Sequence, residues 1–322
     1  MKEPYLVLLY YCYTNISNPN KFREKHHLFC INNNLKGRII VSKEGINGTI
    51  SGKKNDCENY MKKIYSDIRF KNVEFKIAKY PKNVFNKLNV RLKKEIVNSG
   101  IKNIDPNKLS GKYIEPKEFK SILKNDDDDV VILDIRSNYE YNVGKFKNAI
   151  TLDIENFREF QAKIDELKKI KDKKIITYCT GGVKCEKASG FLLKKGFKNV
   201  YQLHGGIIKY GIEEDGYDFE GKCYVFDNRL TVNINKSNPS VISKCYITGE
   251  LSDRMVNCAN PECNIHVPMS QNGSKLFKGC CSKSCMKNEK IRTYNGSGSY
   301  QKSLNGYNPF IGYKNKSRKI KS

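Results

Sequence analysis

The segment from Lys173 to Gly196 constrains the fold of this chain more than any other. Two β-branched residues, Ile175 and Ile176, precede Cys179, a Gly-Gly turn follows, and apolar residues at helical spacing then run to Gly196. This pattern predicts a strand, a short loop and a helix. Because the loop joins the carboxyl end of a strand to the N-terminus of a helix, we expect Cys179 in the crevice where open α/β sheets bind ligands.

The loop after Cys179 favours a reactive cysteine. Unpaired N–H groups and the dipole of the following helix stabilise an anion, so we expect a lowered pKa for Cys179 and a thiolate or persulfide at this position. The adjacent Gly181 and Gly182 let the backbone turn its amides toward the sulfur. The alternative is a buried strand cysteine followed by an ordinary turn.

The charge of the chain favours a polyanionic partner. With 322 residues the chain can form two or three domains, each with its own core. Its 59 Lys and Arg residues against 34 Asp and Glu give a net charge of +25, which makes nucleic acid the leading partner class. The alternative is a composition that is simply rich in Lys and Asn.

The sequence predicts a cytoplasmic protein that does not enter the membrane. No uncharged apolar run approaches the roughly 20 residues needed to span a bilayer. The short apolar run near Met1 lacks a small-residue cleavage site and suits a first strand better than a signal peptide. Twelve cysteines in such a chain indicate catalysis and metal binding rather than disulfides. These patterns leave the oligomeric state open.

Residues 1–80 are expected to form a ferredoxin-like sandwich. The hydrophobic patterns predict strands, helices and turns in the order βαββαβ. The expected strands are residues 5–13, 37–42, 48–52 and 73–77, and the expected helices are residues 19–34 and 55–66. Such sandwiches can present a sheet face or loop to RNA, or serve as dimerisation or scaffold modules.

Residues 81–112 are expected to be a basic connector. Lys and Arg alternate there with apolar residues, and Lys79, Arg91 and Lys93 are the candidates for contacts with RNA phosphates. The alternative is a solvated, extended linker.

Residues 113–222 alternate strands with helices, which predicts a doubly wound parallel sheet. The apolar run 130–135 is typical of a buried parallel strand, residues 156–170 are expected to be helical, and residues 199–203 form a further strand before Gly205 and Gly206. The whole chain is therefore predicted to combine α+β and α/β domains.

Three motifs in this region resemble the rhodanese domain. They are Asp134-x-Arg136 with Glu140 and Gly144, the loop from Cys179 to Lys184, and Gly205-Gly206. Phosphatases of similar fold would need arginine six positions after the cysteine, where this chain has Cys185. The six-residue loop fits a persulfide better than a phosphate ester. Two positions depart from the family: Lys184 stands where arginine is frequent, and Lys145 where histidine is usual.

A narrower resemblance extends over nearly the whole chain. Residues 37–49, 179–187, 205–211 and 221–227 are similar to those of the rhodanese-domain tRNA uridine hydroxylases. This resemblance implies an oxidoreductase that installs 5-hydroxyuridine at the wobble position of tRNA, with molecular oxygen as co-substrate. The excess positive charge agrees with a tRNA partner. The sequence contains no recognisable flavin or nicotinamide motif.

Within this resemblance, Cys179 is the expected catalytic cysteine. Lys184 would close the anion-binding loop, and Cys185 would act as a resolving thiol or pack against the sheet. Asp134, Arg136 and Glu140, together with the loop residues Thr180, Gly181 and Gly182, are expected to support the loop rather than contact substrate. Two other functions remain open: a sulfurtransferase that passes persulfide sulfur from Cys179 to an acceptor, and a non-catalytic zinc protein that binds RNA.

Residues 223–287 form a cysteine-rich region that predicts a structural zinc site. Thiolates and an imidazole within about forty residues are typical zinc ligands. Thr248 stands where a Cys-x-x-Cys pair would place its second sulfur, so one four-ligand site is expected rather than two, with free thiols as the alternative. The candidate ligands are Cys245, Cys258, Cys263, His266, Cys280, Cys281 and Cys285. Residues 288–322 are expected to be a flexible basic tail.

Overall fold

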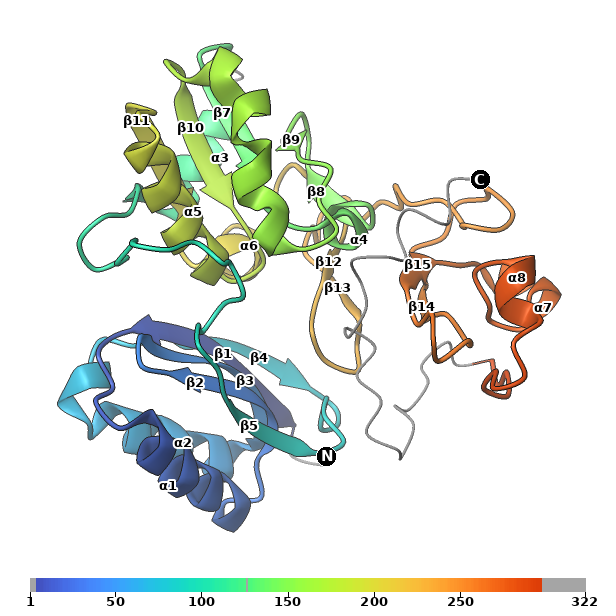
Figure 1. Ribbon diagram of the computed structural model, residues 1–322, viewed down its shortest axis with the longest axis horizontal. Helices are drawn as coiled ribbons and strands as arrows, with labels where there is room; N and C mark the ends of the chain where they lie inside the picture. The colour runs from blue at the N-terminus through green and yellow to red at the C-terminus, as the bar shows by residue number, and fades with distance from the viewer. Residues whose placement is uncertain (1–3, 126, 297–322) are drawn as a thin grey trace.

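The computed structural model describes residues 4–125 and 127–296, which form an N-terminal domain, a central domain and a C-terminal module (Figure 1). The basic tail expected after residue 287 lies mostly outside the described residues. Among the described residues, we find no helix with both the length and the apolar character that a bilayer crossing requires.

The N-terminal domain is the expected ferredoxin-like sandwich, with one strand more than predicted. Its sheet has the strand order β4-β1-β3-β2-β5, and two helices cover one face (Figure 1). The elements are β1 (Tyr5–Tyr13), α1 (Pro19–Asn32), β2 (Lys36–Ser42), β3 (Gly45–Lys53), α2 (Lys54–Tyr65), the 3-10 turn η1 (Ile68–Phe70), β4 (Lys76–Tyr80) and β5 (Leu88–Leu92).

Strand β1 is buried on both faces because its side chains alternate between two partners. Leu6, Leu8 and Tyr10 pack into the core beneath the helices. The residues between them point the other way, where Leu9 and Tyr11 meet the central domain. The strand therefore joins the two domains.

Two boundaries differ from the sequence expectation. Strand β4 begins at Lys76 rather than Val73, because residues 71–75 form a turn and an irregular segment after η1. The segment expected to be a connector contributes β5, which pairs in parallel with β2 through contacts such as Ile40 with Arg91. Its alternating apolar residues supply the buried Val90 to the N-terminal core, so this part of the segment is sheet rather than linker.

The central domain has the expected parallel sheet, with the strand order β6-β11-β10-β7-β9. Residues 157–170 are helical as expected, but they are wound as a 3-10 helix. The elements are β6 (Lys112–Ile114), α3 (Pro116–Asn125), β7 (Val130–Asp134), α4 (Asn138–Tyr141), β8 (Gly144–Phe146), β9 (Ile150–Thr151), η2 (Phe157–Ile170), β10 (Lys174–Tyr178), α5 (Val183–Lys194), β11 (Asn199–Leu203) and α6 (Gly206–Glu213).

Helices cover both faces of this sheet, as a doubly wound fold requires. One core contains residues of η2 and α5, including Phe160 and Leu192. The other contains residues of α3 and α6, including Phe119 and Tyr210. The central strand β10 lies between β11 and β7, so Cys179 follows the middle strand of the sheet.

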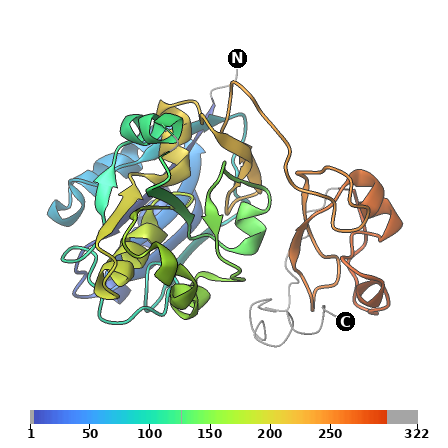
Figure 2. The same cartoon turned by 90° about the horizontal axis from the view of Figure 1, so that it is seen from above.

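The C-terminal module follows a small antiparallel sheet that joins it to the central domain. Strand β12 (Phe219–Tyr224) pairs with β8 and with β13 (Thr231–Asn233). The module itself consists of β14 (Met255–Asn257), β15 (His266–Pro268), α7 (Gln271–Leu276) and α8 (Lys283–Met286). Figure 2 shows it beside the central domain at the end of an extended segment. A hydrogen bond of 2.5 Å between Tyr224 Oη and His266 Nδ1 connects the two.

Candidate active site and metal centre

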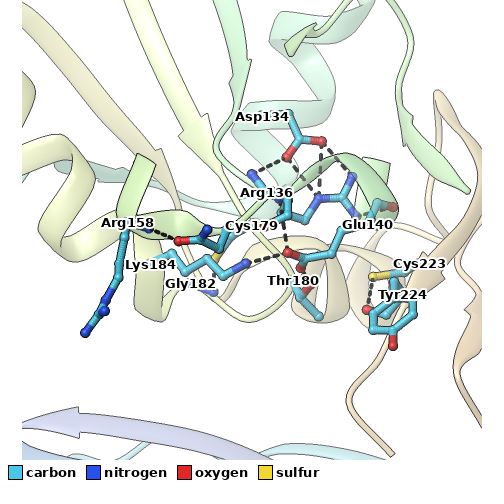
Figure 3. Close-up of polar contacts among 12 residues, drawn as sticks. Asp134, Arg136, Glu140, Arg158, Cys179, Thr180, Gly182, Lys184, Cys223 and Tyr224 are labelled. Atoms are coloured by element: carbon cyan, nitrogen blue, oxygen red, sulfur yellow. Dashed lines mark hydrogen bonds and ion pairs between the residues drawn. The ribbon is translucent and has the colours of Figure 1, made fainter. Parts of the chain in front are cut away.

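Cys179 lies directly after β10, and its sulfur faces the turn that begins α5 (Figure 3). The backbone N–H of Gly182 donates a hydrogen bond of 3.2 Å to Cys179 Sγ. Gly182 has φ = 97°, a left-handed conformation that glycine adopts without a steric cost. The Gly-Gly turn therefore directs the Gly182 amide at the sulfur.

The loop keeps Cys179 ionised although the residue is almost fully buried. Burial by itself raises the pKa of a thiol. Here the Cys185 thiol, the Lys184 charge and the backbone N–H groups of Lys184 and Gly182 outweigh burial and lower the pKa of Cys179 to about 6. At neutral pH the site holds a thiolate, which is the nucleophilic form of cysteine.

A second pair of glycines fixes the loop from the β11 side. The N–H groups of Ile207 and Ile208, in the first turn of α6, donate to the carbonyls of Cys179 and Thr180 at 3.0 Å each. Gly206 has φ = 66°, and a Cβ there would lie 2.4 Å from the Cys179 carbonyl oxygen. Only glycine permits this approach, which explains the glycine at position 206.

Lys184 is held by Glu140 and does not extend freely into solvent (Figure 3). Its Nζ lies 2.6 Å from Glu140 Oε2, and the Glu140 side chain is fully buried. The other carboxylate oxygen of Glu140 accepts a bond of 3.5 Å from Thr180 Oγ1, and the backbone N–H of Ser137 also bonds this carboxylate. Lys184 therefore closes the loop through an ion pair and acts on Cys179 through its charge.

Asp134 and Arg136 form a buried ion pair behind the loop. Both side chains are fully buried, with Arg136 Nη2 2.6 Å from Asp134 Oδ2. The guanidinium also donates to the backbone carbonyls of Glu140 and Gly144. Removing one partner of such a pair typically costs about 3–5 kcal/mol of folding free energy, because the other charge stays buried. The pair thus fixes the segment that carries Glu140, and the arrangement matches a supporting role.

The N-terminal domain covers the cysteine loop, which the sequence patterns did not indicate. Tyr13 Oη donates to the Val183 carbonyl at 3.2 Å, and Tyr11 Oη donates to Glu186 Oε1 at 2.8 Å. Leu9 packs so closely that a Cβ on Gly181 would lie 2.9 Å from its Cδ2. The apolar residues on both faces of β1 are the signal from which this contact could have been inferred.

Ion pairs fix this arrangement of the two domains. The nearly fully buried Lys187 of α5 lies 2.8 Å from Glu44 and 3.1 Å from Glu95. Lys209 of α6 lies 2.9 Å from Glu74 on the N-terminal side. A pocket of about 300 Å³ opens at this boundary, with Tyr11, Tyr13, Lys76, Tyr113 and His204 among its lining residues.

The three candidate RNA-binding residues do not form one surface. Lys79 lies on β4 and Arg91 on β5, which are the opposite edges of the N-terminal sheet. Lys79 pairs with Leu6 and so points to the helix-covered side. Lys93, just after β5, donates its backbone N–H to the Val41 carbonyl. A single basic ledge made by all three residues is therefore not formed.

Four of the seven candidate metal ligands come together in the C-terminal module. The sulfurs of Cys258, Cys263, Cys281 and Cys285 all lie within 4.8 Å of one another. The Cys263–Cys281 and Cys281–Cys285 sulfur distances are both 3.7 Å. A zinc ion with Zn–S bonds of about 2.3 Å places tetrahedral sulfurs about 3.8 Å apart, so the four residues fit a metal.

The other three candidates lie outside this cluster. Cys280 is fully buried in the apolar core of the module, where burial raises the pKa of its thiol to about 12. Cys245 accepts a hydrogen bond from the Thr248 N–H at 3.4 Å, and His266 contacts Tyr224. Sequence spacing alone did not separate these residues from the four that converge.

Comparison with known proteins identifies the domains. Residues 5–96 match the UPF0176 acylphosphatase like domain, residues 115–213 the rhodanese-like domain, and residues 220–286 the rhodanase C-terminal domain. A solved rhodanese-like domain from Anabaena sp. is 27% identical, covering 34% of this chain and 78% of that chain, with a TM-score of 0.29.

Two relatives extend over most of the chain. A protein of Cytophaga hutchinsonii named tRNA uridine(34) hydroxylase is 57% identical over 311 residues, covering 97% of this chain and 99% of the relative. A protein of Staphylococcus aureus strain JH9 with the same name is 46% identical over 292 residues, covering 89% of this chain and 91% of the relative. The chain belongs to the tRNA uridine(34) hydroxylase family.

Proposed function

We propose that this protein is a cytoplasmic oxidoreductase that hydroxylates C5 of uridine 34 in tRNA, with molecular oxygen as co-substrate and Cys179 as its catalytic cysteine. The observation that carries this function is the 57% identity to a named tRNA uridine(34) hydroxylase along 97% of the chain. The net charge of +25 supports tRNA as the substrate. The buried thiolate of Cys179 supplies a reactive group next to a polar loop.

Hydroxylation by molecular oxygen needs two electrons. One oxygen atom enters the C5–H bond and the other leaves as water, which takes up two electrons and two protons. Cys185 is placed to contribute, because its thiol donates a hydrogen bond to Cys179 and burial raises the pKa of Cys185 well above its usual value. We propose that the two thiols supply both electrons and both protons when their sulfurs join in a disulfide, which an external thiol then reduces.

Replacing Cys185 with serine is expected to slow product formation without weakening the binding of tRNA. Reduced wild-type protein, freed of reductant and given tRNA and oxygen, should form product while losing two free thiols per product. We expect Cys185→Ser to bind tRNA normally and to form product at least about tenfold more slowly. The amount of 5-hydroxyuridine is measured by mass spectrometry, and the number of free thiols is measured by titration. Wild-type rates in Cys185→Ser, or product without thiol loss, would contradict this role.

The four-cysteine cluster is proposed to hold a structural zinc ion. Cys258, Cys263, Cys281 and Cys285 provide four thiolate donors, the set that closed zinc sites use. The module has only short strands and helices, so a metal would supply much of its stability. The cluster would not take part in the reaction.

The overall function is tested by nucleoside analysis of tRNA from cells that lack the protein. We expect 5-hydroxyuridine and its derivatives at position 34 to disappear while thiolated bases stay unchanged, and growth without oxygen to have the same effect in normal cells. Loss of thiouridine instead would indicate a sulfurtransferase. Unchanged nucleosides would indicate a protein that binds RNA without modifying it.

A further inference from the structure

One face of the N-terminal sheet has the charge expected of a surface that binds nucleic acid. This loop-side face consists of the strand residues whose side chains point to the same side as Leu9, which contacts the cysteine loop. Helices α1 and α2 cover the opposite face, as Figure 1 shows. The loop-side face is therefore the side of the sheet directed at the central domain.

The pairing register assigns two arginines to this face. Leu9 of β1 pairs with Thr49 of β3, and Thr49 pairs with Arg38 of β2. One step along the strands, Ile40 of β2 pairs with Arg91 of β5. Residues paired across neighbouring strands point to the same side of a sheet, so both arginines share the face of Leu9.

The strands contribute cations and no carboxylate to this face, and Glu74, just before β4, lies 3.4 Å from Lys76. None of the five strands includes an Asp or Glu. The cations whose register assigns them to this side are Lys36, Arg38, Lys53, Lys76 and Arg91. Both arginines are exposed, and within residues 4–125 and 127–296 neither forms a salt bridge with an acidic side chain. Their charge is available to a partner.

The two arginines lie at a short distance from the cysteine loop. Neighbouring strands are about 4.8 Å apart, so Arg38 lies about 10 Å across the sheet from β1, and Arg91 about 14 Å. Strand β1 contacts the loop through Leu9, Tyr11 and Tyr13. A nucleic acid strand that approaches the loop over β5 and β2 would cross both arginines.

We propose that Arg38 and Arg91 bind backbone phosphates of the tRNA anticodon arm beside the nucleotide that reacts at Cys179. The proposal rests on the proposed function, because it assumes that tRNA is the substrate. The planar guanidinium matches the geometry of phosphate, and such contacts fix the position of a nucleic acid without reading its sequence. Lys79 points to the other side of the sheet and has no part in this surface.

A charge-matched pair of double variants tests the proposal. Arg38→Glu with Arg91→Glu replaces two cations of the loop-side face with two carboxylates. Lys25→Glu with Lys62→Glu makes the same change in net charge on exposed positions of α1 and α2, which cover the opposite face. Binding of a transcribed tRNA that carries uridine at position 34 is measured by equilibrium titration from low to moderate salt. The Arg38→Lys with Arg91→Lys variant keeps the charge and serves as the rescue control.

The arginine-to-glutamate variant is expected to bind tRNA about tenfold or more weakly. The slope of log affinity against log salt concentration should fall by about 1.5, the effect of two lost phosphate contacts. The helix-side variant should change the slope by less than about 0.5, and the lysine variant should keep most of the affinity. Equal losses in the two glutamate variants, or no loss in the arginine variant, would overturn the proposal. Product formation by the wild-type protein tests the proposed function separately, since phosphate binding and chemistry are measured independently.

Discussion

Replacing Cys179 with serine is expected to abolish formation of 5-hydroxyuridine in tRNA. Serine keeps the shape of the side chain, but its hydroxyl does not ionise near neutral pH as the Cys179 thiol does with its pKa of about 6. We expect the rate of product formation to fall by at least about 10³-fold. The measurement is mass spectrometry of nucleosides after reaction of purified protein with unmodified tRNA, and in a deletion strain that carries the variant.

Cys30→Ala is the matched control, because Cys30 is a buried cysteine in the N-terminal core, far along the chain from the loop. This control should keep close to wild-type activity at a temperature where it is folded. Binding of tRNA by Cys179→Ser should also stay normal, since Cys179 is nearly inaccessible and adds no charge to the loop-side face. A Cys179→Ser protein that still restores the modified base would remove Cys179 from the chemistry.

The local patterns predicted the cysteine loop because all of its determinants are close in sequence. The strand, the two glycines and the helix that follow one another here direct N–H groups toward the sulfur, and the structure has the Gly182 N–H 3.2 Å from Cys179 Sγ. The ferredoxin-like and doubly wound folds followed from hydrophobic periodicity in the same way. The parallel strand β5 was missed, because its partner β2 lies more than forty residues earlier and no local signal marks such a pairing.

The surroundings of the loop could not be predicted, because they depend on how separate domains meet. Tyr11 and Tyr13 contact the loop only because the N-terminal sheet turns one face toward the central domain. The same contact between domains places Arg38 on the face of the sheet that is directed at the central domain. Lys79 and Arg91, although close in sequence, occupy opposite edges of the sheet. Density of basic residues along the chain was therefore a poor guide to which of them share a surface.

Removing a ligand of the cysteine cluster is expected to unfold the C-terminal module, whereas removing its neighbour in sequence is not. Cys281 contributes to the cluster, whereas the adjacent Cys280 is fully buried and is not one of the four converging sulfurs. We expect wild-type protein and Cys280→Ala to contain about one zinc ion per chain and Cys281→Ser close to none. The reason is that a binding free energy of about 10 kcal/mol is lost when the set of four thiolates is incomplete. Metal analysis measures this, and limited proteolysis should cleave residues 245–286 in Cys281→Ser and in chelator-treated wild type, with the central domain intact. Zinc contents that are equal in Cys281→Ser and Cys280→Ala would rule out the cluster as the site, since each variant removes one of two adjacent sulfurs and only Cys281 belongs to the cluster.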